Sequence, residues 1–287
     1  MTSSEIRSKL RACRLIAIDL DGTFLSWTSG ISARSRAVVH AMAARSALIV
    51  PTTGRDLRTA RDDILQAPEL RYFITANGAL VEDAFTGERL AAHLMEREGA
   101  ARLVERFEGP DTAFYVQQDD GGTGFWGCAD LDAAQDISRG KMDGSAAVRA
   151  GYRADVAGAV RAGTEGVPKV GILFRAPWTT EKIAAVVAAE FPGLVLYETD
   201  VRNVEVSAQG ADKGAALALL CAHLGIAMED VCAIGDNGND IGMLSEAGLG
   251  VAMRNAAPAV VAAADVVTEH DNEHEGAARF FQEYLLS

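Results

Sequence analysis

The sequence contains no apolar run long enough to span a membrane, and no charged-then-apolar leader precedes Leu15. We therefore expect no contact with a membrane and a cytoplasmic location. Basic residues are also fewer than acidic ones. The chain has 27 Lys and Arg against 40 Asp and Glu, which gives a formal net charge of -13. A nucleic-acid backbone needs a basic footprint, so this charge argues against nucleic acid as a partner. It does not exclude a small phosphorylated ligand, provided that local cations and a metal offset the repulsion.

Cysteine is scarce, and the four that occur lie far apart in mostly apolar surroundings: Cys13, Cys128, Cys221 and Cys232. Their spacing does not suit a disulfide framework or a zinc cluster, so we predict reduced thiols in the core. The five histidines likewise show no metal-ligand spacing. Neither residue type predicts a metal centre.

The chain has 287 residues, of which 49% are hydrophobic, and a globular chain of this length usually forms two domains. From about Glu82 the pattern changes from apolar runs followed by helices to runs of strands with intervening helices. We predict an α/β fold with a Rossmann-like parallel-sheet core, formed by residues 1–83 and 207–287. Residues 84–206 are expected to form an inserted α+β domain.

An acidic loop follows the apolar run Leu15 to Ile18, which is typical of a buried parallel strand. Ligands bind at such strand ends in open α/β sheets. Asp19 and Asp21 project to the same side of an extended chain, so two carboxylates converge here. They suit a hard cation such as Mg²⁺, which prefers oxygen ligands. An acidic surface turn is the simpler alternative, and a calcium loop is disfavoured because apolar residues occupy its later ligand positions.

A second apolar run, Ala47 to Val50, leads into Thr52, Thr53 and Gly54 just before a helical pattern. A hydroxyl, a close-approaching glycine backbone and a helix N-terminus together make an anion-binding corner. We favour Thr53 over Thr52 as the hydroxyl that matters because Thr53 directly precedes Gly54. An ordinary turn capped by Thr53 explains the same residues.

A cation opens the helix that is predicted after Asp212, a suitable N-cap residue. Lys213 then lies in the first helical turn, where the helix dipole disfavours a positive charge. An anion bound at that point would reverse the penalty. Taken alone, a lysine that faces solvent is the commoner explanation.

The densest group of polar residues follows the predicted strand Val231 to Ile234. It includes Asp236, Asn239 and Asp240, and two acids with two amides at one strand end exceed what a helix cap requires. Earlier in the chain Asn77 precedes a glycine, a pair that is also the strongest short signal for a hairpin turn.

Four segments in this order resemble the four motifs of the haloacid dehalogenase-like (HAD) hydrolases. They are Asp19-Leu20-Asp21-Gly22-Thr23, Thr53-Gly54, Lys213 and Gly235-Asp236-Asn237-Gly238-Asn239-Asp240. The Asn77-Gly78-Ala79 segment and the α+β insert are similar to the Cof-type subgroup, class IIB with a C2-type cap. The resemblance implies that the insert is a cap that closes over the core, excludes water and selects the leaving group.

The resemblance also implies roles. Asp19 would be the nucleophile, Asp21 the general acid and base, and Lys213 a contact of both nucleophile and phosphoryl group. To donate a proton first, Asp21 must begin protonated, so we expect it to be buried beside other acids. The remaining roles are binding and support: Thr53, Gly54, Lys213 and Asn239 for the phosphate, Asp19, the Asp21 backbone carbonyl and Asp236 for Mg²⁺, and Asn77 and Asp240 as supporting residues.

These assignments predict a Mg²⁺-dependent phosphatase that hydrolyses a small phosphorylated metabolite, a sugar phosphate above all, through an aspartyl phosphate. One alternative is a phosphomutase of the phosphomannomutase type, which shares this core and would yield an isomer in place of free phosphate. Another is a non-catalytic module that binds the phosphometabolite. Four residues of the insert are candidates for substrate contact, although each fits surface, turn or packing better: Asp119, Trp126, Arg175 and Trp178.

Overall fold

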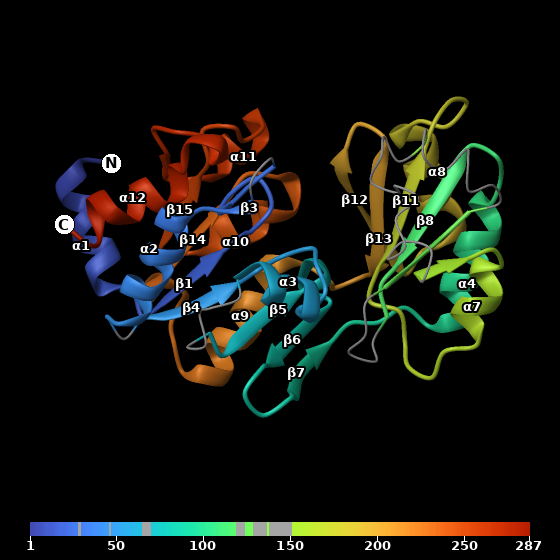
Figure 1. The fold of residues 1–287 in the computed structure, drawn as a ribbon, viewed down its shortest axis with the longest axis horizontal. Coiled ribbons are helices and arrows are strands. Elements are labelled where there is room, and N and C mark those ends of the chain that lie inside the picture. The colour runs from blue at the N-terminus through green and yellow to red at the C-terminus, as the bar shows by residue number, and fades with distance from the viewer. Residues whose placement is uncertain (28–29, 46, 65–69, 119–123, 129–136, 138–150) are drawn as a thin grey trace. The chain divides into compact units, whose positions relative to one another are not determined.

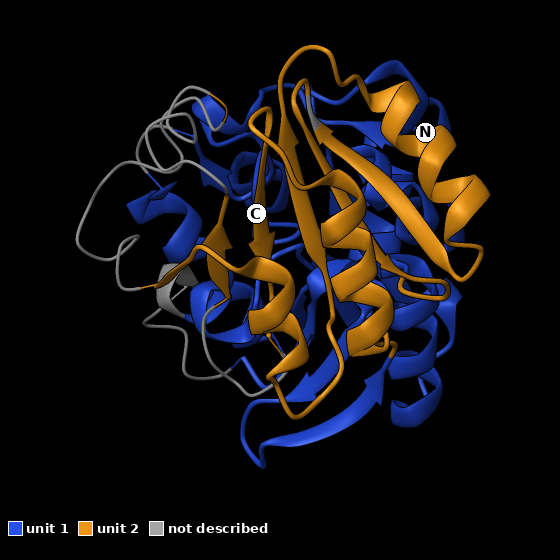
Figure 2. Cartoon of the chain, turned by 90° about the vertical axis from the view of Figure 1, so that its right-hand side faces the viewer, with its two compact units in different colours: residues 1–92, 212–287 blue, residues 93–211 orange. Residues whose placement is uncertain are grey.

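The structure, a computed structural model, describes residues 1–287 apart from 28–29, 46, 65–69, 119–123, 129–136 and 138–150. It divides into two compact units, coloured separately in Figure 2. Unit 1 comprises Met1–Ala92 and Asp212–Ser287, and unit 2 comprises His93–Ala211. These limits differ from the predicted ones at 83/84 and 206/207.

A five-stranded parallel sheet forms the centre of unit 1 (Figure 1). Its strand order is β16-β15-β14-β1-β4. Ile18 lies opposite both Ile234 and Pro51, so the polar segments that follow these three strands leave the sheet at the same edge. The strands are β1 (Leu15–Ile18), β4 (Leu48–Pro51), β14 (Val231–Gly235), β15 (Leu249–Ala252) and β16 (Val266–Val267).

Helices cover both faces of this sheet, which is why its strands are apolar runs without alternation. Ile16 and Ile18 face one core cluster, and Leu15 and Ala17 face another. The first cluster includes side chains of α1 (Ser3–Ala12), α2 (Ala33–Ala43), α3 (Leu57–Ile64) and α12 (Gly276–Tyr284), and the second includes side chains of α9 (Lys213–Leu224), α10 (Ile241–Glu246) and α11 (Pro258–Ala263). The predicted Rossmann-like α/β core is thus confirmed.

Two smaller antiparallel elements complete unit 1. A short hairpin of β2 (Leu25–Ser26) and β3 (Gly30–Ile31) follows the first acidic loop. A three-stranded sheet consists of β5 (Tyr72–Thr75), β6 (Leu80–Asp83) and β7 (Glu88–Ala92). Because β7 pairs with β6, residues that the sequence placed in the insert lie in unit 1.

Unit 2 is an α+β unit with a six-stranded sheet in the order β10-β9-β8-β11-β13-β12. Every neighbouring pair is antiparallel except β9 and β10. Three helices contribute side chains to one core cluster with the sheet, and Figure 2 shows them on one face. The strands are β8 (Thr112–Val116), β9 (Phe125–Gly127), β10 (Tyr152–Arg153), β11 (Val170–Phe174), β12 (Leu194–Asp200) and β13 (Asn203–Ala208), and the helices are α4 (Arg97–Phe107), α7 (Val156–Arg161) and α8 (Thr180–Glu190).

The four substrate-contact candidates of the insert have ordinary surroundings where they are described. Trp178 packs edge-on against a phenylalanine ring of α4, and Trp126 lies against a tyrosine ring of β8. Arg175 pairs with Asp111, with 2.9 Å between Nε and Oδ1. Asp119 lies outside the described residues. These contacts favour the packing and surface explanation.

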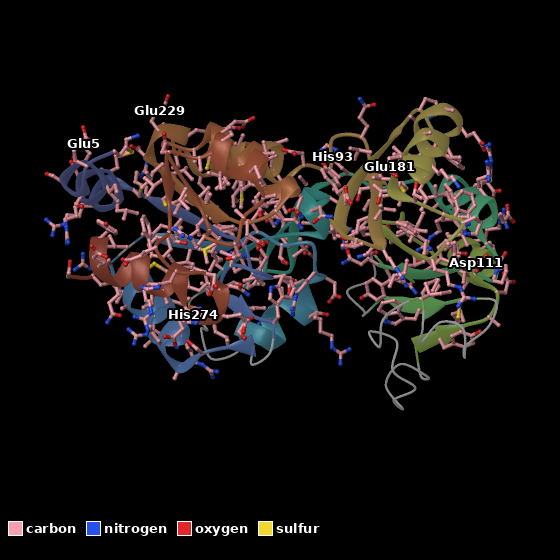
Figure 3. The ribbon with its side chains drawn as sticks, turned by 90° about the horizontal axis from the view of Figure 1, so that it is seen from above. Glu5, His93, Asp111, Glu181, Glu229 and His274 are labelled. Atoms are coloured by element: carbon pink, nitrogen blue, oxygen red, sulfur yellow. The ribbon has the colours of Figure 1, made fainter. Side chains whose placement is uncertain are left out.

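The remaining composition-based expectations concern thiols, histidines and membranes. All four cysteines are free thiols, and three of them are buried. His274 lies at the surface of unit 1, where its Nδ1 is 2.6 Å from Asp271 Oδ1 (Figure 3). None of the helices in the described part of the chain has the length and hydropathy to cross a membrane.

Candidate active site

A buried ammonium group joins two carboxylates at the sheet edge. Lys213 Nζ donates to Asp19 Oδ1 at 2.7 Å and to Asp240 Oδ1 at 2.6 Å. Asp19 directly follows β1, and Lys213 is the first residue of α9, which Asp212 caps through the Ala215 N–H. The three side chains are 6%, 1% and 0% exposed for Asp19, Lys213 and Asp240. A solvent-facing lysine, the commoner explanation, is therefore wrong, and the two carboxylates offset the unfavourable helix dipole.

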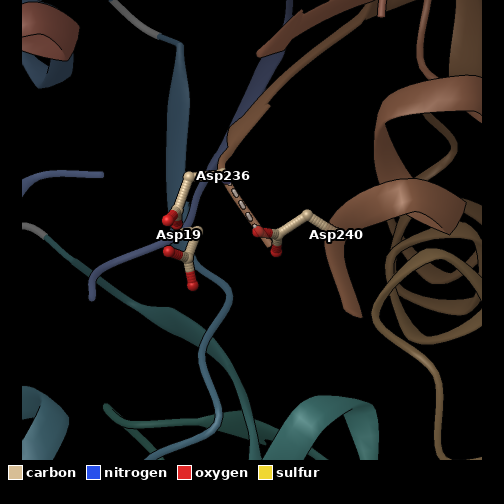
Figure 4. A group of neighbouring side chains, drawn as sticks. All are labelled: Asp19, Asp236 and Asp240. Carbon is tan, nitrogen blue, oxygen red and sulfur yellow. Dashed lines mark hydrogen bonds between the residues drawn. The ribbon is translucent and has the colours of Figure 1, made fainter. Parts of the chain in front are cut away.

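The third acid, Asp236, follows β14 and lies beside Asp19 (Figure 4). One oxygen atom from each of Asp19, Asp236 and Asp240 lies within 4.8 Å of the others, a spacing that suits a metal ion. Asp240 is the poorest ligand of the three, because Oδ1 binds Lys213 and Oδ2 accepts the N–H groups of Asp236 and Asn237 at 3.0 and 2.9 Å. Asp19 and Asp236 are the better ligands.

Three carboxylates around one ammonium group leave two negative charges without a compensating cation among these four residues. Burial raises the pKa of Asp19 well above its usual value. The negative charges of Asp240 and Asp236 add to this increase, and the positive charge of Lys213 only partly opposes it. Burial and the charge of Asp240 raise the pKa of Asp236 to about 7. Burial would lower the pKa of Lys213, but Asp19 and Asp240 outweigh it and raise that pKa. The donor set therefore fits a divalent cation that prefers oxygen ligands.

Asp21 has a partner that the sequence did not predict. Arg55 binds it with two parallel hydrogen bonds, Nη2 to Oδ1 at 2.6 Å and Nε to Oδ2 at 2.7 Å. The Asp21 side chain is 37% exposed. The expected burial is therefore wrong, because the guanidinium group draws this carboxylate toward the loop that follows β4. The only sequence signal was an arginine directly after the Thr53-Gly54 pair.

The predicted anion-binding corner lies at the end of β4, and both threonines there are buried. The Thr52 hydroxyl donates back to the Val50 carbonyl at 3.2 Å, whereas the Thr53 hydroxyl accepts the Arg55 N–H at 3.2 Å. The Asn77 N–H also donates to the Thr53 carbonyl, at 3.1 Å. These contacts place the Thr53 hydroxyl in the loop, and the preference for it over Thr52 stays a prediction.

Two amides from distant segments meet beside this corner. Asn239 Nδ2 donates to Asn77 Oδ1 at 2.9 Å, and Asn77 is fully buried with a φ of 59°. Asn239 Oδ1 is buried and has no hydrogen-bond partner among the described residues. Buried acceptors of this kind usually have a partner, so an added donor at this point would satisfy it. This hydrogen bond joins the Asn77-Gly78 turn to residues 235–240, the segment that resembles the fourth motif.

Gly22 provides a first test of this geometry. Its φ is +79°, and a Cβ atom there would lie 2.4 Å from Asp236 Oδ2. We expect Gly22→Ala to lower the unfolding free energy by about 1–3 kcal/mol through backbone strain and to weaken binding of a divalent cation by displacing that carboxylate. Gly30→Ala is the matched control, because φ is +67° but nothing lies within 4 Å. Chemical denaturation and Mg²⁺ titration calorimetry would compare them, and equal Mg²⁺ affinities would contradict this reading.

Two residues that contact the site, Arg55 and Asn255, had no role assigned from the sequence, and Thr23 was expected only to make a local hydrogen bond within the first motif. Thr23 Oγ1 donates to Asp236 Oδ1 at 3.2 Å, and Asn255 Nδ2 lies 3.3 Å from Asp236 Oδ2. Threonine and asparagine occur in many loops, so neither carried a signal by type. Their contacts depend on how separate loops meet.

Comparisons with known proteins identify relatives of this chain. A family model described as haloacid dehalogenase-like hydrolase matches residues 16–281. The chain is 28% identical over 278 residues to the 5-amino-6-(5-phospho-D-ribitylamino)uracil phosphatase YcsE of Bacillus subtilis, covering 95% of this chain and 96% of that protein. It is 31% identical over 283 residues to the putative phosphatase YxeH of Bacillus subtilis, covering 96% and 99%.

The solved structure of a HAD subclass IIB sugar phosphatase matches with a TM-score of 0.75 and 21% identity, covering 94% of this chain and 98% of that chain, which shows the shared fold. The fold and the site together define an α/β enzyme in which carboxylates at the ends of parallel strands lie around one buried lysine. The chain belongs to the haloacid dehalogenase-like hydrolase family, in its Cof-type branch. It is a phosphoric monoester hydrolase by class.

Proposed function

We propose that this chain is a Mg²⁺-dependent phosphatase that hydrolyses a small phosphorylated metabolite through an aspartyl phosphate on Asp19. The observation that carries the proposal is the buried Asp19–Lys213–Asp240 group beside Asp236, with two negative charges in excess. Such a group of buried charges destabilises a protein core unless a bound ligand compensates it. A bound cation would compensate the excess negative charge, and a phosphoryl group would be the target of the nucleophile and the lysine.

Asp19, Asp236 and the backbone carbonyl of Asp21 would hold the metal ion. Bound there, Mg²⁺ supplies positive charge that lowers the repulsion between an anionic nucleophile and an anionic phosphoryl group. The two uncompensated charges match a divalent ion, and all the ligand atoms are oxygens, as Mg²⁺ prefers.

In the first half of the reaction, an Asp19 oxygen attacks phosphorus and forms an acyl phosphate while the bond to the leaving oxygen breaks. Lys213 binds Oδ1, and Oδ2 has no hydrogen-bond partner among the described residues, so Oδ2 is the attacking atom. Asp21 donates a proton to the leaving oxygen, for which it must first take up a proton and give up one of its two hydrogen bonds from Arg55. Thr53, the Gly54 N–H and Lys213 hold the phosphoryl oxygens.

In the second half, water attacks phosphorus and the bond to Asp19 breaks, which releases inorganic phosphate and restores the carboxylate. Asp21 accepts the proton from this water. The two hydrogen bonds from Arg55 keep the Asp21 carboxylate in one orientation for that transfer. Asn239, fixed by Asn77, orients the phosphate through its amide.

The printed names of two relatives support the proposed substrate class. YcsE is named for a phosphorylated ribityl compound, and the subclass IIB neighbour is named a sugar phosphatase. We therefore place sugar phosphates and related polyol phosphates first. A cytoplasmic location remains a prediction of the sequence.

A panel assay tests the proposed function. Purified protein is incubated with sugar phosphates, 5-amino-6-(5-phospho-D-ribitylamino)uracil, nucleotides and cofactor phosphates, with Mg²⁺ or with EDTA. Release of inorganic phosphate that requires Mg²⁺ supports the proposal. Formation of a phosphate isomer without release would identify a phosphomutase, and no turnover across the panel would overturn the proposal.

Mg²⁺ affinity should depend on pH because the metal must displace a proton from Asp236, whose pKa is raised to about 7. We expect the dissociation constant to fall at least about tenfold per pH unit up to about pH 7, because Asp19, the other ligand, also has a raised pKa and must lose its proton too. In EDTA, without metal, the stability of the fold should fall as pH rises, whereas Mg²⁺ binding strengthens. An acid with a raised folded pKa stabilises the fold fully below its unfolded pKa of 3.8, and that contribution is lost as pH rises through about 7.

Titration calorimetry across this pH range and thermal melts in EDTA measure the two effects. Asp236→Asn is the control, since it has no carboxylate to titrate and should show less loss of stability with rising pH. Mg²⁺ affinity that stays constant from about pH 5.5 to 7 would contradict the assignment.

A further inference from the structure

The side chain of Asn255 connects three separate segments of unit 1. Its two Nδ2 hydrogens reach the Gly22 carbonyl at 2.9 Å and Asp236 Oδ2 at 3.3 Å. Its Oδ1 accepts the Asn272 N–H at 3.2 Å. Both N–H groups and the carbonyl of the amide are therefore used, although the residue is exposed.

Asp236 consequently accepts one hydrogen bond on each carboxylate oxygen. Thr23 Oγ1 donates to Oδ1 at 3.2 Å, and Asn255 Nδ2 donates to Oδ2. Thr23 is buried in the first acidic loop, whereas Asn255 follows β15. Two donors on opposite oxygens restrict rotation of the carboxylate plane, which Figure 4 shows beside Asp19.

Asn255 is itself held by a short 3₁₀ turn, η4 (Asn272–His274). Asn272 is buried, and its Nδ2 donates to the Leu25 carbonyl at 3.1 Å. Glu273 Oε1 accepts the Trp27 N–H at 2.6 Å. The same turn thus fixes both the hairpin that follows the acidic loop and the amide of Asn255.

We propose that Asn255 is a positioning residue that aims the Asp236 carboxylate at the metal and holds the Asp21–Gly22 turn in register with it. The inference rests on the proposed function, since it takes Asp236 as a ligand of Mg²⁺. Asn255 acts through these partners. Groups that hydrogen-bond to metal ligands commonly change metal affinity or activity by about 10–100-fold when removed.

The experiment uses the full chain freed of metal with EDTA and dialysed. Mg²⁺ binding is measured by titration calorimetry for the wild type, Asn255→Ala and Asn255→Leu, the last of which keeps most of the side-chain volume without the donors. We expect both variants to bind Mg²⁺ about 10–100-fold more weakly. Thermal midpoints in EDTA should stay close to the wild type. Raising Mg²⁺ to saturation should restore most of kcat.

Arg254→Ala is the control on the same loop. Removing a positive charge cannot weaken cation binding by charge alone, so its Mg²⁺ affinity should equal or exceed that of the wild type. If the wild type binds no Mg²⁺, the proposed function fails. If the wild type binds Mg²⁺ and the Mg²⁺ dissociation constants of both Asn255 variants lie within about twofold of the wild-type value, the role of Asn255 is overturned and the proposed function stands. Lower stability in EDTA with unchanged Mg²⁺ affinity also overturns it, because that result describes a structural residue.

Discussion

Asp19→Asn is expected to stop phosphate release, with kcat reduced by at least about 10⁴-fold, the scale seen when a nucleophile is removed. An amide oxygen is a much weaker nucleophile than a carboxylate oxygen, so no acyl phosphate forms. Asparagine keeps the shape of the side chain, which separates chemistry from packing. The measurement is phosphate release on the best substrate of the panel at saturating Mg²⁺. Near-normal turnover in this variant would remove Asp19 as the nucleophile.

The same substitution is expected to stabilise the metal-free protein at about pH 8. Burial raises the pKa of Asp19, so the folded state disfavours its ionised form, and asparagine removes that cost. Lys213 keeps a partner in Asp240 at 2.6 Å, so no buried cation is left alone. Thermal melts in EDTA measure the change. An inactive protein with higher stability is the expected combination.

Asp83→Asn is the matched control for Asp19→Asn. Asp83 is another buried acid of unit 1, 2.7 Å from the Arg71 guanidinium group. The hydrogen bond from Arg71 lowers the pKa of Asp83 below its usual value, so the folded state favours the charged form, and Asp83→Asn should lower stability and leave turnover unchanged. If Asp19→Asn also lowered stability in EDTA, the assumed excess of negative charge around Lys213 would be contradicted.

The strand ends could be predicted from the sequence because the physics there is local. A fully apolar run of four residues that ends in acids or hydroxyls reads as a buried parallel strand with a polar end. Parallel register then brings those ends together, as Ile18 beside Ile234 and Pro51 demonstrates. The unfavourable place of Lys213 at a helix N-terminus was a further local signal, since a nearby anion would reverse the penalty, although a lysine facing solvent was the commoner explanation.

Contacts between loops could not be predicted in the same way. The pairing of Arg55 with Asp21 depends on the relative position of two loops that only the register of β1 and β4 fixes. The role inferred for Asn255 depends on a turn near the C-terminus that follows no period. An arginine or an asparagine in a polar loop has many possible partners, and residue type does not choose among them.

The limits of the two units show the same difference. The change of pattern near Glu82 marked the end of one kind of segment, but β7 returns to pair with β6 and so extends unit 1 to Ala92. At the other side, β13 runs to Ala208 and its neighbours continue unit 2 to Ala211. Strand pairing between distant residues sets these limits. Whether unit 2 acts as a cap stays a prediction from the resemblance.

Lys213→Met is expected to lower the unfolding free energy by about 3–5 kcal/mol at pH 8 in EDTA, the usual cost of removing one partner of a buried ion pair. Methionine fills a similar volume, so the loss is electrostatic. Lys213 is 1% exposed and serves two carboxylates. Lys169→Met provides the comparison, since Lys169 is 4% exposed and pairs with Glu205 at 2.6 Å. Both variants should lose stability in chemical denaturation, Lys213→Met more.

The loss in Lys213→Met should shrink as pH falls. Asp19 and Asp236 have raised pKa values in the folded chain, so the fold takes up protons there more readily than the unfolded chain does. Protonation removes the charges that Lys213 compensated, and the variant should therefore approach the wild type toward about pH 5. A deficit that is the same at pH 5 and pH 8 would show that packing, not charge, is lost.

Turnover by Lys213→Met should fall by at least about 10²–10³-fold, because the transferring phosphoryl oxygens lose a fixed cation. The double variant Lys213→Met/Asp240→Asn separates this effect from stability. Asparagine at position 240 removes one of the unpaired acids, so the double variant should regain part of the lost unfolding free energy while phosphate release stays low. Recovery of both together would mean that Lys213 serves the fold alone, whereas recovery of stability without turnover requires that its charge act on the phosphoryl group itself.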